Sequence, residues 1–82
     1  MIKIYSTTWC QSCRFAKSLF ETKNIEYEEI NIEEVGISRL KLKEITGGHT
    51  VPQIVINGTS IGGYDQLIML EQMNKLDELI SL

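Results

Sequence analysis

The sequence predicts a single α/β domain over residues 1–82, with helices flanking a mixed four-stranded sheet. Three observations lead to this prediction. A strand–helix–strand order over residues 2–32 requires a parallel strand pair with a right-handed crossover. Asn57-Gly58 between two apolar segments is a strong hairpin signal, and it adds an antiparallel pair. A length of 82 residues leaves room for one domain with one modest core.

Apolar periodicity places the elements in the order β-α-β-α-β-β-α. The expected bounds, in chain order, are residues 2–5, about 11–23, 25–32, about 33–46, 51–56, 59–61 and about 65 to nearly the end of the chain. The inward positions of the first helix should be Phe15, Ala16, Leu19 and Phe20. Those of the second should be Ile37, Leu40 and Ile45.

Composition and charge narrow the function classes. With 43% apolar and 23% charged residues, the chain has the composition of an ordinary soluble globular protein. A net charge of −3 gives no basic surface for nucleic acid or an anionic membrane. No apolar run approaches the roughly 20 residues of a membrane span, and we expect no secretory signal. Two Cys and one His are too few for a closed four-ligand zinc site or a disulfide-stapled mini-domain.

The most informative segment is Cys10-Gln11-Ser12-Cys13, where a strand gives way to a helix. This spacing places both sulfurs on one side of the first helical turn, close enough to form a disulfide. At the helix N-terminus, the thiol of Cys10 should have a pKa below its usual value of about 8.5, aided by the charges of Arg14 and Lys17. Cys13, one turn deeper, is suited to attack a mixed disulfide on Cys10. The alternatives are two unreactive buried cysteines or half of a shared metal site.

Two further clusters have more than one interpretation. Thr50-Val51-Pro52 begins a strand, and proline is acceptable there in either isomer of its peptide bond. In Gly62-Gly63-Tyr64-Asp65 the glycines permit a close approach of backbone. Asp65, taken alone, is best interpreted as a helix cap.

Together, Tyr5-Ser6, Cys10-Gln11-Ser12-Cys13, Thr50-Val51-Pro52 and Ile61-Gly62-Gly63-Tyr64-Asp65 resemble the glutaredoxin family in order and spacing. The resemblance extends from Ile2 to about Leu79. It implies a thioredoxin-like fold, a cis peptide bond before Pro52, and glutathione as reductant and mixed-disulfide partner.

The resemblance also implies a set of glutathione-binding residues: Thr50, Val51, Pro52, Gly63, Tyr64, Asp65 and Arg39. The backbone of Thr50 and Val51 would pair with the cysteine of glutathione. Gly63 and Asp65 would hold its γ-glutamyl end. Arg39 matches a position that often contacts the glycine carboxylate, and its alternative is a solvated arginine on a helix face.

Three features depart from the family pattern. Thr7 stands where many members have lysine, Gln11-Ser12 replaces Pro-Tyr, and Trp9 precedes the first cysteine. Two alternatives therefore stay open. One is a glutaredoxin-like electron donor to ribonucleotide reductase, recycled by thioredoxin reductase, although such proteins generally lack the Gly-Gly-x-Asp cluster. The other is a dimer that bridges a [2Fe–2S] cluster, with Cys10 of each chain and two glutathiones as ligands and no other metal site.

We therefore predict a dithiol glutaredoxin that reduces protein disulfides and glutathione mixed disulfides through Cys10 and Cys13. Its expected partners are glutathione and disulfide-containing or glutathionylated proteins, and it is expected to be a monomer. Such a couple would have a potential of about −200 to −230 mV, which suits electron transport and redox homeostasis in the cytoplasm.

Overall fold

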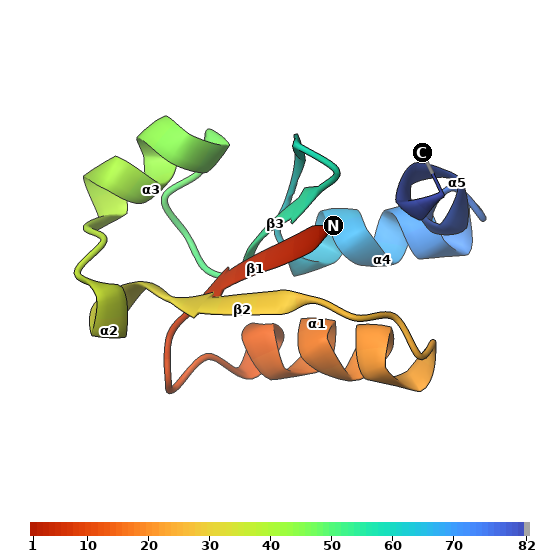
Figure 1. The fold of residues 1–82 in the computed structure, drawn as a ribbon, viewed down its shortest axis with the longest axis horizontal. Helices are drawn as coiled ribbons and strands as arrows, with labels where there is room; N and C mark the ends of the chain where they lie inside the picture. The colour runs from red at the N-terminus through yellow and green to blue at the C-terminus, as the bar shows by residue number, and fades with distance from the viewer. Residues whose placement is uncertain (82) are drawn as a thin grey trace.

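A computed structural model describes residues 1–81 and contains a four-stranded mixed sheet with helices on both faces (Figure 1). The strands are β1 (Ile2–Ser6), β2 (Glu28–Asn31), β3 (Gln53–Ile56) and β4 (Thr59–Gly62). The helices are α1 (Gln11–Thr22), α2 (Ile32–Val35), α3 (Arg39–Thr46), α4 (Tyr64–Gln72) and α5 (Leu76–Ile80). None of these helices is long and apolar enough to cross a membrane. The predicted fold class is confirmed.

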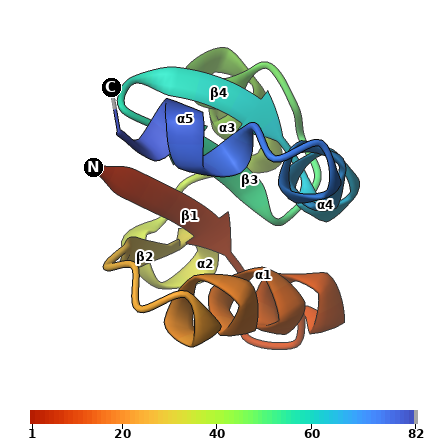
Figure 2. The same ribbon diagram turned by 90° about the vertical axis from the view of Figure 1, so that its right-hand side faces the viewer.

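The strands lie in the order β2-β1-β3-β4, which Figure 2 shows from the side. β1 is parallel to β2, as the strand–helix–strand order predicted, and antiparallel to β3. β3 and β4 form the predicted hairpin, in which Asn57 has φ 50° and Gly58 has φ 85°. Positive φ at both central residues is the requirement of a type I′ turn, and Asn-Gly meets it at little cost.

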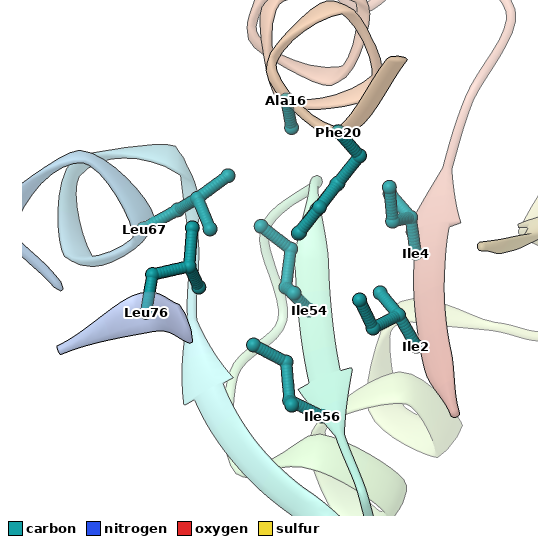
Figure 3. Close-up of a cluster of buried hydrophobic side chains, with 8 residues drawn as sticks. All are labelled: Ile2, Ile4, Ala16, Phe20, Ile54, Ile56, Leu67 and Leu76. Carbon is teal, nitrogen blue, oxygen red and sulfur yellow. The ribbon is translucent and has the colours of Figure 1, made fainter. Parts of the chain in front are cut away.

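The main core lies between the sheet and three helices, α1, α4 and α5 (Figure 3). Its buried side chains are Ile2, Ile4, Ala16, Phe20, Ile54, Ile56, Leu67 and Leu76. Because alternate residues of a strand share a face, the isoleucines of β1 and β3 all point to this side. A smaller cluster on the other face contains Tyr5, Ile32 and Leu42, and α2 and α3 cover it.

Two expected helices are each divided in two. Gly36 adopts a left-handed conformation with φ 77° and ends α2, after which Ser38 caps α3. Asn74, with φ 58°, separates α4 from α5 in the same way. A left-handed residue cannot continue an α-helix, so the chain changes direction at each point. These breaks let short helices follow a small core closely.

The expected inward face of the second helix was right at Ile37, which packs against the smaller cluster, and wrong at its other two positions. Leu42 is fully buried, whereas Leu40 is 71% exposed and Ile45 is also exposed. The phase changed because α3 starts at Arg39, after the break, and not at about residue 33. Phe15, expected inward on α1, is half-exposed.

Replacing Leu76 with alanine tests whether α5 belongs to the cooperative core. Leu76 is fully buried against the main cluster. We expect Leu76→Ala to lower the free energy of unfolding by about 2–5 kcal/mol, because the substitution leaves a cavity. The matched variant Leu40→Ala, on the exposed side of α3, should change it by less than about 0.5 kcal/mol. Urea unfolding of both variants measures this, and equal losses would contradict the assignment.

Candidate active site

Cys10 and Cys13 lie where β1 leads into α1. Cys10 is the N-cap of α1, and its Sγ accepts a hydrogen bond of 3.0 Å from the backbone N–H of Cys13. The two sulfurs are joined in a disulfide, which their spacing predicted to be possible. Cys13 is only 1% exposed, whereas Cys10 is partly accessible. An incoming thiolate can therefore reach the sulfur of Cys10 and not that of Cys13.

The loop between α3 and β3 lies against Cys10. Its Val51–Pro52 peptide bond is cis, as the resemblance implied. The carbonyl oxygen of Val51 lies 3.6 Å from Cys10 Sγ. The sulfur of Cys10 is therefore adjacent to the backbone of this loop.

A pocket of about 610 Å³ opens beside the disulfide. Six of the seven residues predicted to bind glutathione line it: Thr50, Val51, Pro52, Gly63, Tyr64 and Asp65. The N-terminus of α1 contributes Ser12 to the same lining. The pocket thus joins segments from three parts of the chain, and their roles in binding remain predictions.

Arg39 is the predicted residue that does not line the pocket. Its Nη1 donates a hydrogen bond of 3.1 Å to the carbonyl oxygen of His49. In this arrangement Arg39 supports the loop that precedes Thr50, in addition to being exposed on α3.

The N-terminus of α4 forms one wall of the pocket. Gly63 is the N-cap, and its N–H donates 2.9 Å to Oε1 of Gln66. Asp65 therefore does not cap the helix, which corrects the interpretation of that residue taken alone. Within residues 1–81 its exposed carboxylate makes no hydrogen bond or ion pair, so it is free to meet a ligand.

Aromatic residues occur next to Cys10 in the sequence and in the lining of the pocket. Trp9, next to Cys10, is 88% exposed. Tyr64 packs against Phe15, with ring centroids 5.7 Å apart, which explains why Phe15 lies outside the core. Helical spacing alone could not predict whether Phe15 packs in the core or against the pocket wall, because its partner Tyr64 belongs to α4.

Lys17, which was expected to add positive charge near Cys10, forms an ion pair with Glu29 instead. Its Nζ lies 2.9 Å from the Glu29 carboxylate, which also accepts a hydrogen bond from Ser6. Burial alone would raise the pKa of Glu29, but the bonds from Lys17 and Ser6 outweigh it and lower that pKa. The charge of Lys17 is thus balanced by Glu29 of β2. Of the two cations expected to aid Cys10, Arg14 is the one without a side-chain partner in the described chain.

Gln53 is a pocket residue that sequence reasoning missed. It is the first residue of β3, is only 4% exposed, and donates 3.3 Å through Nε2 to Oγ1 of Thr50. Strand alternation places it on the face opposite Ile54, but its bond to Thr50 depends on the shape of the loop. Ser60 and Gln66 also line the pocket and were missed.

Among the described residues of this one chain, no group of three or more His, Cys, Asp or Glu side chains could hold a metal ion. The bridging-cluster alternative uses one cysteine from each of two chains, so this finding does not address it.

The comparisons with known proteins agree with this geometry. The glutaredoxin family model matches residues 2–61. A glutaredoxin of Pseudomonas aeruginosa is 41% identical over 80 residues, spanning 98% of this chain and 95% of the relative. Glutaredoxin 3 of Escherichia coli is 34% identical, spanning 96% and 95%.

Solved structures show the same relationship. A buckwheat glutaredoxin–glutathione complex has a TM-score of 0.89 at 28% identity, covering 98% of this chain and 76% of that one. A glutaredoxin of Brucella melitensis has a TM-score of 0.82 at 37% identity, covering 96% and 86%. With its Cys10–Cys13 pair, this chain belongs to the glutaredoxin family of thiol–disulfide oxidoreductases, which have a thioredoxin-like fold.

Proposed function

We propose that the protein is a dithiol glutaredoxin that uses glutathione to reduce protein disulfides and glutathione mixed disulfides. One observation carries the proposal. The accessible sulfur of Cys10 lies 3.6 Å from the cis-proline loop, and the adjoining pocket includes the carboxylate of Asp65, which has no partner within residues 1–81. The buckwheat relative of the same fold was solved as a complex with glutathione, which supports this choice of ligand.

The loop offers backbone groups to a peptide. Residues 48–52 lie in a loop. Among the backbone–backbone hydrogen bonds of turns, loops and helix caps in the described part of the chain, none involves these residues. The N–H and C=O of Val51 are therefore available to pair with an extended peptide, as an added strand pairs with a sheet edge. This pairing would place the cysteine of glutathione beside Cys10.

The N-terminus of α4 suits the γ-glutamyl end of glutathione, which carries an ammonium and a carboxylate. Asp65 would bind the ammonium through a charge-assisted hydrogen bond. The N–H groups of the first turn of α4 would receive the carboxylate, because a helix N-terminus favours negative charge. Both groups of the ligand would then be satisfied within one turn of the helix.

Reduction of the oxidised protein proceeds in two exchanges. A glutathione thiolate attacks Cys10 Sγ, the Cys10–Cys13 bond breaks, and Cys13 leaves as a thiolate that takes a proton from water. A second glutathione thiolate then attacks the glutathione sulfur of the mixed disulfide. Cys10 leaves as a thiolate, and glutathione disulfide is the product.

The reduced protein acts in the opposite direction. The Cys10 thiolate attacks one sulfur of a substrate disulfide, and the other substrate sulfur leaves. Cys13 then attacks Cys10 Sγ, releases the second substrate sulfur and restores the disulfide. With a glutathione mixed disulfide as substrate, Cys10 takes the glutathione and a second glutathione can release it without Cys13. The N–H of Cys13 and the N-terminus of α1 stabilise the Cys10 thiolate whenever it forms. We assign this cycle to a reducing compartment with a glutathione pool, such as the cytoplasm.

Replacing Cys10 with serine should abolish reduction of both substrate classes, because no other accessible sulfur lies at the N-terminus of α1. The coupled oxidation of NADPH in the presence of glutathione and glutathione reductase measures this. Full activity of Cys10→Ser would contradict the redox assignment.

Cys13→Ser should separate the two activities. Reduction of a glutathionylated peptide needs only Cys10 and should largely survive. Reduction of an intramolecular protein disulfide should fall, because nothing within the protein then resolves the mixed disulfide. Parallel assays with both substrates measure the effect, and equal losses would contradict the division of roles.

Asp65→Asn tests the γ-glutamyl site, because it preserves size while removing the charge. We expect about a ten- to hundredfold higher apparent KM for glutathione, which is what one charge-assisted hydrogen bond contributes. Thermal stability should change little, since Asp65 is exposed and does not cap α4. Asp77→Asn, a carboxylate change on α5, is the control for KM; it also removes the ion pair of Asp77 with Lys23, so it is not a control for stability.

An unaltered KM in Asp65→Asn would remove the main support for glutathione as reductant. Efficient reduction of the oxidised wild-type protein by thioredoxin reductase and NADPH, without glutathione, would then favour the ribonucleotide-reductase donor alternative.

A further inference from the structure

We propose that Gln53 is a positioning residue, whose buried amide holds the backbone of Thr50 and Val51 ready to pair with the peptide of an incoming thiol. The inference rests on the proposed function, since it concerns recognition of the glutathione backbone in the mixed disulfide with Cys10. It assigns a role to a side chain that does not carry the reacting atoms.

The loop before β3 depends on side chains for its shape. Because residues 48–52 lack backbone–backbone hydrogen bonds outside the helices and strands, other contacts must define them. Oγ1 of Thr46 is hydrogen-bonded to the backbone of Gly48, and Arg39 donates to the carbonyl of His49. Gln53 makes the bond that reaches Thr50 itself.

Gln53 is held firmly enough to serve this purpose. It pairs with Tyr5 in the sheet, so its backbone is fixed by β1. Its amide packs directly against the backbone of Gly48, where an added Cβ would lie 2.5 Å from Nε2 and 2.9 Å from the amide carbon. Glycine at position 48 therefore provides the space in which the amide sits.

The chemistry of the position also indicates a specific role. Burying an amide is unfavourable unless it forms hydrogen bonds, and an apolar side chain would fill the same space at a lower free-energy cost. Within residues 1–81, the bond to Thr50 is the hydrogen bond that the Gln53 side chain makes. Thr50 is exposed, so without this bond its segment would sample other conformations.

The expected consequence is a loss of recognition. If the binding-competent conformation of the loop becomes less populated, apparent affinity falls in proportion. One neutral hydrogen bond corresponds to about a two- to tenfold effect. The effect should be greatest for a thiol with a peptide backbone, because only such a thiol pairs with Val51.

The experiment compares two reductants of the oxidised protein, glutathione and 2-mercaptoethanol. Each second-order rate constant is measured by rapid quenching and thiol alkylation, then corrected for the thiolate fraction of the reductant. The ratio of the two constants reports recognition of the peptide. In Gln53→Met, which preserves the length of the side chain, we expect this ratio to fall about two- to tenfold.

Three further variants make the result specific. Thr50→Val removes the hydroxyl that Gln53 contacts, so it should lower the ratio similarly. Adding Gln53→Met to Thr50→Val should then cause no further fall. Tyr27→Phe removes a side-chain hydrogen bond to Glu21, far from the loop, and should leave the ratio unchanged.

An unchanged ratio in folded Gln53→Met would overturn the inference, as would a fall that persists in full in the Thr50→Val background. Should Gln53→Met fail to fold, the single variant Thr50→Val decides: a lowered ratio supports the inference and an unchanged one overturns it. A wild-type ratio near one would overturn the proposed glutathione dependence itself, and the inference with it.

Discussion

The antiparallel pairing of β1 with β3 is the constraint on which the site depends. Ile4 pairs with Ile54 and Tyr5 with Gln53, so the end of β1 lies beside the start of β3. The chain leaves β1 toward Cys10 and enters β3 through the cis-proline loop. Two segments about forty residues apart in the sequence therefore meet, with Cys10 Sγ lying 3.6 Å from the carbonyl oxygen of Val51. The buried isoleucines that hold this pair together also hold the site together.

The hairpin extends this constraint to α4. β3 runs away from the disulfide, and β4 returns to the same end because the Asn57-Gly58 turn reverses the chain tightly. The approach is close, since a Cβ at Gly63 would lie 3.3 Å from the carbonyl oxygen of Pro52. The N-terminus of α4, with Asp65 in its first turn, is thereby placed in the pocket beside the loop. Asp65 is far from the cysteines along the sequence, but the pairing of these three strands brings it into the pocket beside them.

Features that depend on neighbouring residues in the sequence could be predicted from it. Alternation, the Asn-Gly turn and the Cys10–Cys13 spacing led to the fold class and the disulfide, because each is set by neighbouring residues. The inward face of α3 was missed because its phase depends on the left-handed Gly36, and Leu42 is buried in place of Leu40. The sequence also could not predict which side chains meet groups from other segments, such as the hydrogen bond from Arg39 to the carbonyl oxygen of His49.

The lysine pattern shows how the site can work with little positive charge. Thr7 stands where the family resemblance implied a lysine, and Lys17 forms an ion pair with Glu29, whose pKa is lowered by that contact and by Ser6. Stabilisation of the Cys10 thiolate is then left chiefly to the N–H of Cys13 and the N-terminus of α1. Under the proposed function, recognition of glutathione similarly falls to backbone groups of the loop and to Asp65. Backbone groups bind only in the correct orientation, whereas a lysine attracts an anion over a range of positions. The conformation of the loop should therefore be important for recognition in this protein.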